Sequence, residues 1–424
     1  MTRIAFVGAG SVEFTQALVG DMLTLPELAD STLALHDRDP NRLALAEGVA
    51  HAVANAVGAP ATVEAHSDRR AALDGADFVI CTIRVGGHPA RVTDFEVPAR
   101  HGIRQTMADT LGIGAIFHAA RTIPVMVDIA RDMTELCPDA WLLNYTNPMA
   151  MLVWGVYAGT SHQRVVGLCP SIENTAEQLA ERIGVPFGEV TFLGAGINHQ
   201  AWLLRFERDG EDLYPRLDEV LAADPDGIGR TARAELYRRL RHYPSESSEH
   251  TVDCLPYVLP HAGEVERLRV WVGEYLERSR RNLRRVEETG AALAAGAAMD
   301  VTRDFEYSTR IIHSIVTGTP RTVYASVRND GLIANLPDGC CVEVPCLVGR
   351  AGIQPTVIGH LPPQCAALNR TFASVCELVV RGVLEGCQDH LRHAAMLDPA
   401  TAAALSLPQI DALVDDMVAT AATV

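Results

Sequence analysis

Short apolar runs alternate with longer stretches of helical spacing over the first 150 residues of the chain. Short apolar runs bounded by turn residues are typical of buried strands, and apolar residues repeated every three or four positions are typical of helices. Strands that alternate with helices predict βαβ units and a parallel sheet, which places this part of the chain in the α/β class. The expected strands are 4–7, 32–35, 62–65, 78–83 and 141–143, and the expected helices are 14–25, 42–57 and 119–137.

The pattern changes beyond residue 165, and we place a domain boundary there, between 1–165 and 166–424. The second part mixes strand-like and helix-like segments without regular alternation, so we expect it to be an α+β domain. Its segment 264–300 is rich in Glu, Arg and Ala and predicts one long helix. Further strands are expected at 190–193, 201–206, 323–327 and 341–348, and a further helix at 368–385.

Composition narrows the range of partners and compartments. Hydrophobic residues make up 48% and charged residues 21% of the chain, which is typical of a globular protein. The net charge of −17 argues against nucleic acid and anionic membranes as partners, because both repel an acidic surface. Met1 leads straight into an apolar strand, and no apolar run approaches the ~18 residues of a membrane span. The ten cysteines form no C-x-x-C pair, so we expect a cytoplasmic protein with reduced thiols.

A glycine-rich turn, Gly8-Ala-Gly-Ser11, follows the first expected strand directly. Gly8 permits a tight turn, and Gly10 lets backbone N–H groups approach a pyrophosphate at the start of the next helix, where Ser11 lies. Glu13 occupies the place of the third glycine of the usual fingerprint. The turn therefore predicts dinucleotide binding, with an ordinary glycine-rich turn as the alternative.

An acid at the end of the second strand supports the dinucleotide interpretation. Asp37 lies 27 residues beyond Gly10, somewhat more than the usual interval of about 20. Its carboxylate can accept hydrogen bonds from the ribose hydroxyls, which favours NAD, whereas Arg38 could pair with the 2′-phosphate of NADP. An N-cap of the next helix is the alternative role for Asp37. We therefore expect 1–165 to be a Rossmann-type NAD-binding domain.

Polar and glycine-containing segments recur in a fixed order along the rest of the chain. They are Ile83-Arg-Val-Gly-Gly87, Asp109-Thr-Leu-Gly112, Arg121-Thr-Ile-Pro124, Asn144-Tyr-Thr-Asn-Pro-Met149, Gly167-Leu-Cys169, Gly196-Ile-Asn-His199, Ser247-Ser-Glu-His250, Asn335-Leu-Pro-Asp-Gly339 and Asn369-Arg-Thr371.

With these segments the chain resembles glycoside hydrolase family 4, whose members are NAD- and metal-dependent glycosidases related in fold to lactate and malate dehydrogenases. Any one tetrapeptide could occur by chance, but the ordered set is specific and covers most of the chain, from residue 4 to about residue 371. The arrangement is most similar to the subgroup of α-galactosidases, α-glucosidases and α-galacturonidases. The resemblance implies a lactate/malate-dehydrogenase-like parallel sheet, followed by a domain for substrate, metal and oligomer contacts.

The resemblance also implies a divalent metal ion, usually manganese, held by Cys169 and His199. A thiolate and a neutral imidazole suit a borderline metal and leave positions for substrate oxygens. Taken singly, a cysteine after an apolar strand is usually a buried small hydrophobe, and a lone histidine is usually structural. Asn147, together with His199, is implied to contact the substrate, although Asn-Pro also ends strands as a simple turn.

Two further residues take roles from the same resemblance. Asp109 matches an acid near the active site, with a helix N-cap as the alternative. Arg84 and the glycines near it match the wall on the nicotinamide side, with an ordinary strand-ending turn as the alternative.

The implied reaction differs from ordinary glycosidase chemistry, which uses a pair of carboxylates. NAD takes a hydride from sugar C3, a base removes the C2 proton while the metal stabilises the enediolate, and the C1 leaving group is eliminated. Water then adds and NADH returns the hydride. The base is expected after the metal histidine, with Asp253 first and Tyr257 and His250 behind it. A solvated helix face is the alternative for Asp253.

Two positions depart from the family pattern. Relatives carry His, Asp or Asn after the metal cysteine, whereas this chain has Pro170, which has no polar side chain and no N–H. Either another residue protonates the leaving group, or the leaving group needs little help, or the specificity has changed. His118 stands where relatives often have arginine.

We therefore expect a glycosidase that acts on a small α-glycoside, with a galactoside as the first guess, followed by a glucoside and a uronide. The alternatives are an NAD-dependent dehydrogenase of a sugar or hydroxy acid on the same scaffold, and a homologue that binds NAD or sugar without catalysis. Family habit predicts a homodimer or homotetramer.

Overall fold

The parallel half of the protein is one layer of six strands. The computed structural model describes residues 1–297, 299, 301 and 306–421. In this half the order of neighbouring strands is β6-β5-β4-β1-β2-β3, and every pair is parallel. The α/β Rossmann-type prediction is therefore confirmed. The strands are β1 (Arg3–Val7), β2 (Thr32–His36), β3 (Thr62–His66), β4 (Phe78–Cys81), β5 (Trp141–Asn144) and β6 (Val165–Leu168).

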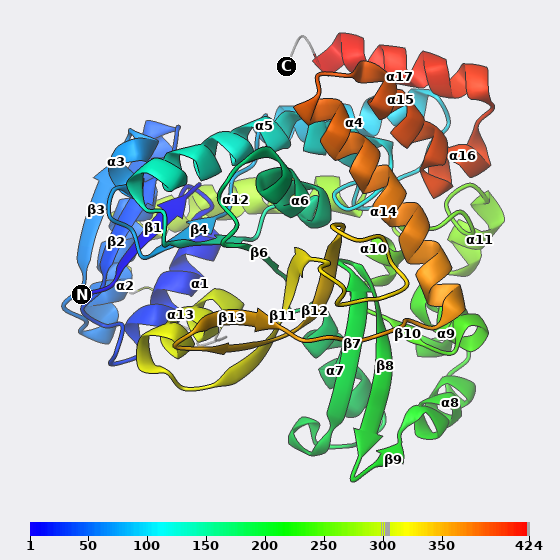
Figure 1. The fold of residues 1–424 in the computed structure, drawn as a ribbon, viewed down its shortest axis with the longest axis horizontal. Helices are drawn as coiled ribbons and strands as arrows, with labels where there is room; N and C mark the ends of the chain where they lie inside the picture. Colours follow the sequence, from blue (N-terminus) through cyan, green and yellow to red (C-terminus); the bar gives the residue numbers. More distant parts are fainter. Residues whose placement is uncertain (298, 300, 302–305, 422–424) are drawn as a thin grey trace.

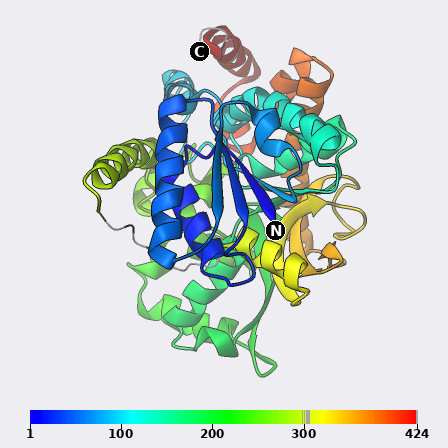
Figure 2. The ribbon, with the colours of Figure 1, turned by 90° about the vertical axis from the view of Figure 1, so that its left-hand side faces the viewer.

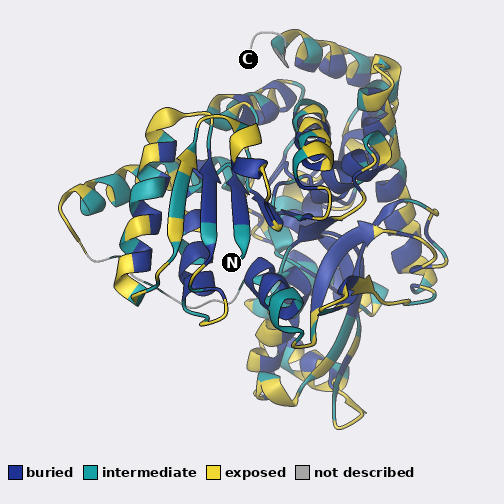
Figure 3. Ribbon diagram, turned by 60° about the vertical axis from the view of Figure 1, so that its left-hand side comes forward, coloured by how far each residue is buried: buried dark blue, intermediate teal, exposed yellow. Residues whose placement is uncertain are grey.

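Helices cover both faces of this layer. In Figure 1, α5 (Ile113–Leu136) and α6 (Met149–Gly159) lie above the sheet, and α1 (Val12–Leu23) lies below it, packed against α2 (Pro40–Val57). Because both faces are covered, the inner strands are almost continuously apolar and buried, as their dark colour in Figure 3 shows, whereas the edge strand β3 is partly exposed. Figure 2 looks onto this end of the molecule, with α2 standing beside the first strands.

Helix α5 has the length and hydropathy of a membrane-crossing helix, and among the described residues it is the one helix that does. Of its most apolar window, 72% is buried inside the protein. Its apolar residues contact α6 and α14 (Pro363–Leu384), so its hydrophobicity belongs to the core.

The sheet continues from the parallel half into an antiparallel half. Strand β6 pairs in parallel with β5 on one side and antiparallel with β11 on the other, with Leu168 opposite Ala325. The sheet therefore runs without a break past residue 165, and the division into domains at that residue stays a prediction. The antiparallel strands are β7 (Thr191–Ile197), β8 (Gln200–Arg208), β9 (Glu211–Asp212), β10 (Tyr243–Pro244), β11 (Arg321–Arg328), β12 (Cys341–Gly349) and β13 (Gly352–Pro355).

The prediction of one long helix over 264–300 is wrong. The segment contains α11 (Ala262–Arg267) and α12 (Glu274–Ala294), separated by a turn in which Arg269 and Gly273 have φ of 53° and 79°. Residues 298 and 300 lie outside the described part of the chain. Apolar residues of helical spacing on both sides of the turn hid it from the sequence pattern. The turn is anchored where Gly273 N–H donates to Gln105 O at 2.8 Å.

The remaining helices connect and cover these strands. They are α3 (Arg69–Leu73), α4 (Gly87–Arg100), α7 (Ser171–Arg182), α8 (Tyr214–Ala223), α9 (Ala232–Leu240), α10 (Ser248–Asp253), α13 (Tyr307–Thr317), α15 (Gln388–Leu397), α16 (Pro399–Ala404) and α17 (Leu407–Ala421).

A buried amide joins helix α14 to strand β8. The side chain of Asn369 accepts a hydrogen bond from Trp202 Nε1 at 3.0 Å and donates to the backbone oxygen of Gln200 at 2.8 Å. It also donates to Gln200 Oε1 at 3.0 Å, and Asn369 is fully buried. Asn369, the first residue of the Asn369-Arg-Thr371 segment singled out in the sequence, therefore has a structural role: it holds α14 against β8.

We expect Asn369→Leu to lower the free energy of unfolding by about 2–4 kcal/mol, because the Trp202 N–H and the Gln200 amide would be buried without partners. Urea unfolding followed by tryptophan fluorescence measures the change. The control is Thr371→Ala, an exposed position two residues further along, where a change within about 0.5 kcal/mol is expected. Equal free energies of unfolding for the two variants would show that the hydrogen bonds of the Asn369 amide do not stabilise the fold.

Candidate active site

A cavity of about 860 Å³ opens along the carboxyl ends of the parallel strands. Its wall takes residues from the segments that follow β1, β2, β4, β5 and β6, and it is completed by the loop after β7 and by one face of α12. In open α/β sheets ligands bind at this edge, because the strands all deliver their next residues to the same side. This cavity gathers most of the residues that the sequence singled out.

The glycine-rich loop forms one end of the cavity. Gly8 has a φ of +93°, and a Cβ there would come within 2.9 Å of the backbone nitrogen of Ile83. A Cβ on Gly10 would come within 2.5 Å of Asp37 Oδ2, which instead accepts the Gly10 N–H at 2.8 Å. Ser11 is the residue before α1 and lines the cavity. The N–H groups of the loop, from Gly8 to Ser11, all donate within the protein. The loop therefore brings the start of α1 to the cavity, and a helix N-terminus suits a pyrophosphate.

Asp37 faces the cavity but is partly engaged with the backbone. Its Oδ1 accepts the N–H of Asp39 at 3.0 Å, and Asp39 itself caps α2 by accepting from Asn41 and Arg42. The N-cap role considered for Asp37 therefore belongs to Asp39. The Asp37 carboxylate, held beside the loop, remains available to ribose hydroxyls on its cavity side.

Helix α12 closes the cavity on the side opposite the sheet. Arg84 donates through Nη2 to Tyr275 Oη at 2.6 Å and through Nη1 to Ser279 Oγ at 3.3 Å. His88 Nδ1 lies 2.9 Å from the same Ser279 hydroxyl. The guanidinium of Arg91 lies over the Tyr275 ring, 4.3 Å from its centre. These contacts join the loop after β4 to the first turns of α12, so the expected wall residue Arg84 is in place.

A sulfur, an imidazole and a carboxylate meet at the other end of the cavity. Cys169 follows β6, and His199 lies in the turn between β7 and β8 with a φ of +64°. Cys169 Sγ is 3.5 Å from His199 Nε2 and 3.8 Å from Glu246 Oε2. One donor atom from each residue lies within 4.8 Å of the others. Thiolate, imidazole and carboxylate are the ligand types of a first-row divalent ion, so these residues fit the expected metal.

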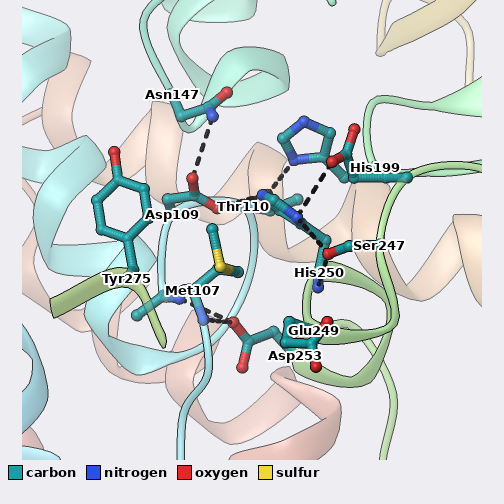
Figure 4. A network of polar contacts seen from close by, with 12 residues as sticks. Met107, Asp109, Thr110, Asn147, His199, Ser247, Glu249, His250, Asp253 and Tyr275 are labelled. Carbon is teal, nitrogen blue, oxygen red and sulfur yellow. Dashed lines mark hydrogen bonds and ion pairs between the residues drawn. The ribbon is translucent and has the colours of Figure 1, made fainter. Parts of the chain in front are cut away.

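A hydrogen-bonded chain sets the orientation of the His199 ring. His199 Nδ1 lies 2.5 Å from Thr110 Oγ1, and that hydroxyl donates to Asp109 Oδ1 at 3.0 Å. Figure 4 draws His199, Thr110 and Asp109 together. With Oγ1 donating to Asp109, Nδ1 carries the proton, and the lone pair of Nε2 lies on the Cys169 side. Burial and the neighbouring His250 lower the pKa of His199 to about 4, so its ring is neutral.

Asp109 and His250 form a buried ion pair beside this chain. His250 Nε2 is 3.5 Å from Asp109 Oδ1, and its Nδ1 is 3.5 Å from Glu246 Oε1. Burial alone would lower the pKa of His250, but Asp109 and Glu246 outweigh it and raise the pKa to about 9. Burial likewise opposes the charge on Asp109, yet His250 and His199 hold its pKa well below the usual range. The pair therefore places one positive and one negative charge next to the metal ligands.

Two residues of the cavity wall each have a buried polar atom without a hydrogen-bond partner among the described residues. Asn147 donates through Nδ2 to Asp109 Oδ2 at 3.2 Å, while its Oδ1 is buried and unpaired. His118 Nε2 is also buried and unpaired, and its Nδ1 is 3.9 Å from Asp94. Burial and the nearby arginines lower the pKa of His118 well below its usual value, so it presents a neutral ring. Both atoms suit sugar hydroxyls.

The structure does not bring Asp253 or Tyr257 to the cavity. The Asp253 carboxylate is buried and accepts three backbone N–H groups, from Thr106, Met107 and Ala108, at 2.9, 2.7 and 2.8 Å. Burial raises its pKa to about 6 against the effect of these donors. Tyr257 is half exposed and lies outside the cavity wall. Asp253 instead shapes the loop that carries Asp109, and the third candidate, His250, is the one inside the cavity.

Several cavity residues escaped the sequence analysis. Glu246 directly precedes the Ser247-Ser-Glu-His250 segment that the sequence analysis singled out. Nothing in the sequence distinguishes Glu246 from Glu249, which lies within that segment. Tyr275 and Ser279 share one face of α12 at the helical spacing of four. The prediction of one long helix over 264–300 did not single out this face. Pro170, the departure noted above, lines the cavity beside Cys169 and precedes α7.

Comparison with known proteins gives a consistent match over the whole length. The sequence family "Family 4 glycosyl hydrolase" matches residues 3–185, and its C-terminal domain matches residues 194–401. An alpha-galactosidase of Bacillus subtilis (strain 168) is 38% identical over 423 residues, covering 99% of this chain and 98% of the relative. An alpha-galactosidase of Rhizobium meliloti (strain 1021) is 34% identical over 433 residues, covering 98% and 87%.

A solved structure agrees in fold. A 6-phospho-alpha-glucosidase from gut microorganisms, in complex with NAD and Mn2+, superposes with a TM-score of 0.84 over 98% of this chain and 97% of that chain. The sequences are 19% identical, so this likeness concerns the fold alone.

We expect Asp253→Asn to act on stability, because an amide cannot accept all three N–H groups of the 106–108 loop. The free energy of unfolding should fall by about 2–4 kcal/mol, measured by urea denaturation. Glu249→Gln, in the same short helix, is the matched control and should leave stability within about 0.5 kcal/mol. An Asp253→Asn protein of unchanged stability whose turnover nevertheless drops ~100-fold or more would return Asp253 to the role of base.

Proposed function

The chain belongs to family 4 of the glycosyl hydrolases, and from that premise we propose that it hydrolyses α-galactosides with NAD and a divalent metal ion, manganese first. It is a glycoside hydrolase. Its alpha-galactosidase relatives, at 38% and 34% identity, support a galactoside as the substrate. A cytoplasmic location and a homodimer or homotetramer are part of the proposal.

One observation carries the proposal: the Cys169–His199 pair and the Gly8–Ser11 loop line the same cavity. A dinucleotide would be held with its pyrophosphate at the start of α1 beside this loop, and the metal ion would be held by Cys169 and His199. Both groups would then share one cavity with the sugar. When bound, NAD accepts and returns a hydride, and the metal acts as a Lewis acid on sugar oxygens.

The chain itself binds and orients the sugar. Asn147 Oδ1 accepts from one sugar hydroxyl, and Asn147 is held for this by its bond to Asp109. His118 Nε2 serves a second hydroxyl. Helix α12, held by Arg84 and His88 through Ser279, covers the cavity and keeps bulk water from the reacting atoms. The Asp109–His250 ion pair holds one negative and one positive charge in fixed positions beside the site. Because these charges are already in place, water molecules do not have to reorient around the reacting atoms during the reaction.

Tyr275 is our candidate for the base that removes the sugar C2 proton. Unlike Asp253 and Tyr257, Tyr275 belongs to the cavity wall. Arg84 donates to its oxygen and Arg91 packs over its ring, so a negative charge on that oxygen would face two guanidinium groups.

We expect release of nitrophenol from 4-nitrophenyl α-D-galactoside to require both NAD and Mn2+. Cys169→Ser should reduce this rate by ~100-fold or more, because a hydroxyl replaces the thiolate ligand. Cys387→Ser, at a partly buried position outside the cavity wall, is the control and should keep the rate. Full activity without NAD, or in Cys169→Ser, would contradict the proposal. Net accumulation of NADH with free sugar would indicate a dehydrogenase instead.

We expect Tyr275→Phe to lower kcat by ~100-fold or more, as removal of a general base does, with a small change in KM. Affinity for NAD, measured by fluorescence titration, should stay within a factor of about 3, because the phenyl ring still packs under Arg91. Tyr157→Phe deletes a hydroxyl that donates to Gly339 O far from the cavity, and should leave kcat unchanged. A Tyr275→Phe enzyme with wild-type kcat would remove Tyr275 from the reaction.

A further inference from the structure

Glu246 occupies a constrained position at the metal end of the cavity. It lies between β10 and α10 with a φ of +70°, a left-handed conformation that is unfavourable for a glutamate. The backbone on either side is fastened: Ser245 N–H donates to Ala201 O at 2.9 Å, and Glu246 N–H donates to Thr175 Oγ1 at 3.1 Å. Such strain costs ~1–3 kcal/mol and concentrates at functional sites.

The same conformation occurs elsewhere around this site. Of the described non-glycine residues with positive φ, His199 has +64° and Ala108, the neighbour of Asp109, has +48°. The loops that carry His199, Asp109 and Glu246 therefore each contain a residue in an unfavourable backbone conformation, while the other described residues of this kind, Asp209, Arg241 and Arg269, lie outside the cavity wall. Packing alone does not require a glutamate at such a position, whereas a ligand that needs a carboxylate does.

Resting on the proposed function, we propose that Glu246 is a third protein ligand of the divalent ion, beside Cys169 and His199. The family resemblance supplied a cysteine and a histidine only, so the carboxylate is an inference from this chain.

The distances fit an ion held by all three residues. Metal–sulfur and metal–nitrogen or –oxygen bonds of ~2.3 and ~2.1 Å that meet at roughly 90–110° put two donor atoms about 3.1–3.6 Å apart. The observed separations from Cys169 Sγ are 3.5 Å to His199 Nε2 and 3.8 Å to Glu246 Oε2. Shifts of a few tenths of an ångström in flexible side chains complete the set, and the backbone need not move.

Charge favours the same arrangement. Without an ion the Cys169 thiol donates to Glu246 Oε2 at 3.8 Å. A dication would take the place of that proton and attract both the thiolate and the carboxylate. A hard carboxylate oxygen also makes the site more suitable for manganese than a site made of sulfur and nitrogen ligands alone. Three protein ligands still leave positions for sugar oxygens, as in catalytic metal sites generally.

The neighbouring group of Asp109, His199 and His250 fits an ion less well, although its donor atoms are also close together. His199 Nδ1 faces Thr110, and only Nε2, on the Cys169 side, is free to bind. Both oxygens of Asp109 already accept hydrogen bonds, from Thr110 and from Asn147. Glu246, by contrast, has Oε1 beside His250 and Oε2 toward Cys169, so one oxygen is steadied while the other faces the ion.

The test is metal binding by the full chain with NAD present, read without turnover. Free Mn2+ is followed by EPR during titration, and Co2+ is titrated in parallel by its visible spectrum. We expect Glu246→Gln to weaken Mn2+ binding by ~10–100-fold or more, at least the loss that follows removal of a partner of a metal ligand. Its Co2+ complex should keep the sulfur-to-cobalt charge-transfer band but show altered d–d bands, because the thiolate stays and one oxygen leaves.

Glu249→Gln is the matched control, since it makes the same change three residues away, outside the cavity wall. It should bind both ions as the unchanged protein does. Equal Mn2+ affinity and an equal Co2+ spectrum in Glu246→Gln would overturn the inference about Glu246.

Cys169→Ser separates this inference from the proposed function. If Cys169→Ser loses Mn2+ and the charge-transfer band while Glu246→Gln binds normally, only the third ligand is wrong. If Cys169→Ser binds Mn2+ normally, the metal site of the proposed function is itself wrong, and the inference falls with it.

Discussion

The parallel alignment of β1, β4, β5 and β6 is the constraint on which the rest of the site depends. Because these strands run in the same direction, each delivers the residues that follow it to one edge of the sheet. The glycine loop, the Arg84 loop, Asn147 and Cys169 are far apart in the sequence, yet all line one cavity. The fold therefore brings the residues proposed for the dinucleotide and for the metal ion to one cavity.

The second half of the protein completes this edge by continuing the same sheet. Pairing of β6 with β11 extends the parallel layer into the antiparallel strands, and the turn between β7 and β8 then carries His199 to within 3.5 Å of Cys169. The Asn369 amide of α14 forms hydrogen bonds with Trp202 and Gln200 of β8. These bonds hold in place the strand that follows His199. The metal pair thus depends on contacts between both halves of the chain.

Electrostatic balance inside the cavity differs from that of the whole molecule. The chain carries a net charge of −17, but the cavity wall contains the guanidinium groups of Arg84 and Arg91 beside Tyr275, and the cationic His250 beside Asp109. Buried charges of both signs are matched closely, which is the condition for keeping them ionised away from water. Overall charge therefore argues against nucleic acid as a partner but does not describe the site.

The sequence by itself determined the class of fold, five of the six strands of the parallel layer and the position of the glycine loop. Local patterns carry these features, because apolar periodicity reports burial and a glycine motif reports backbone geometry. The Cys169–His199 pair came instead from the resemblance of an ordered set of segments, and the tertiary structure puts its two donor atoms 3.5 Å apart. Only the tertiary structure decided which carboxylates and hydroxyls face the cavity. The sequence analysis put Asp253 first as the base, but its oxygens accept three backbone N–H groups of a loop that lies some 145 residues earlier in the sequence. Glu246 and Tyr275 became visible only when a left-handed turn and the break before α12 aimed them at the cavity. Which partner a polar side chain meets is set by long-range packing, and no local pattern of residues records it.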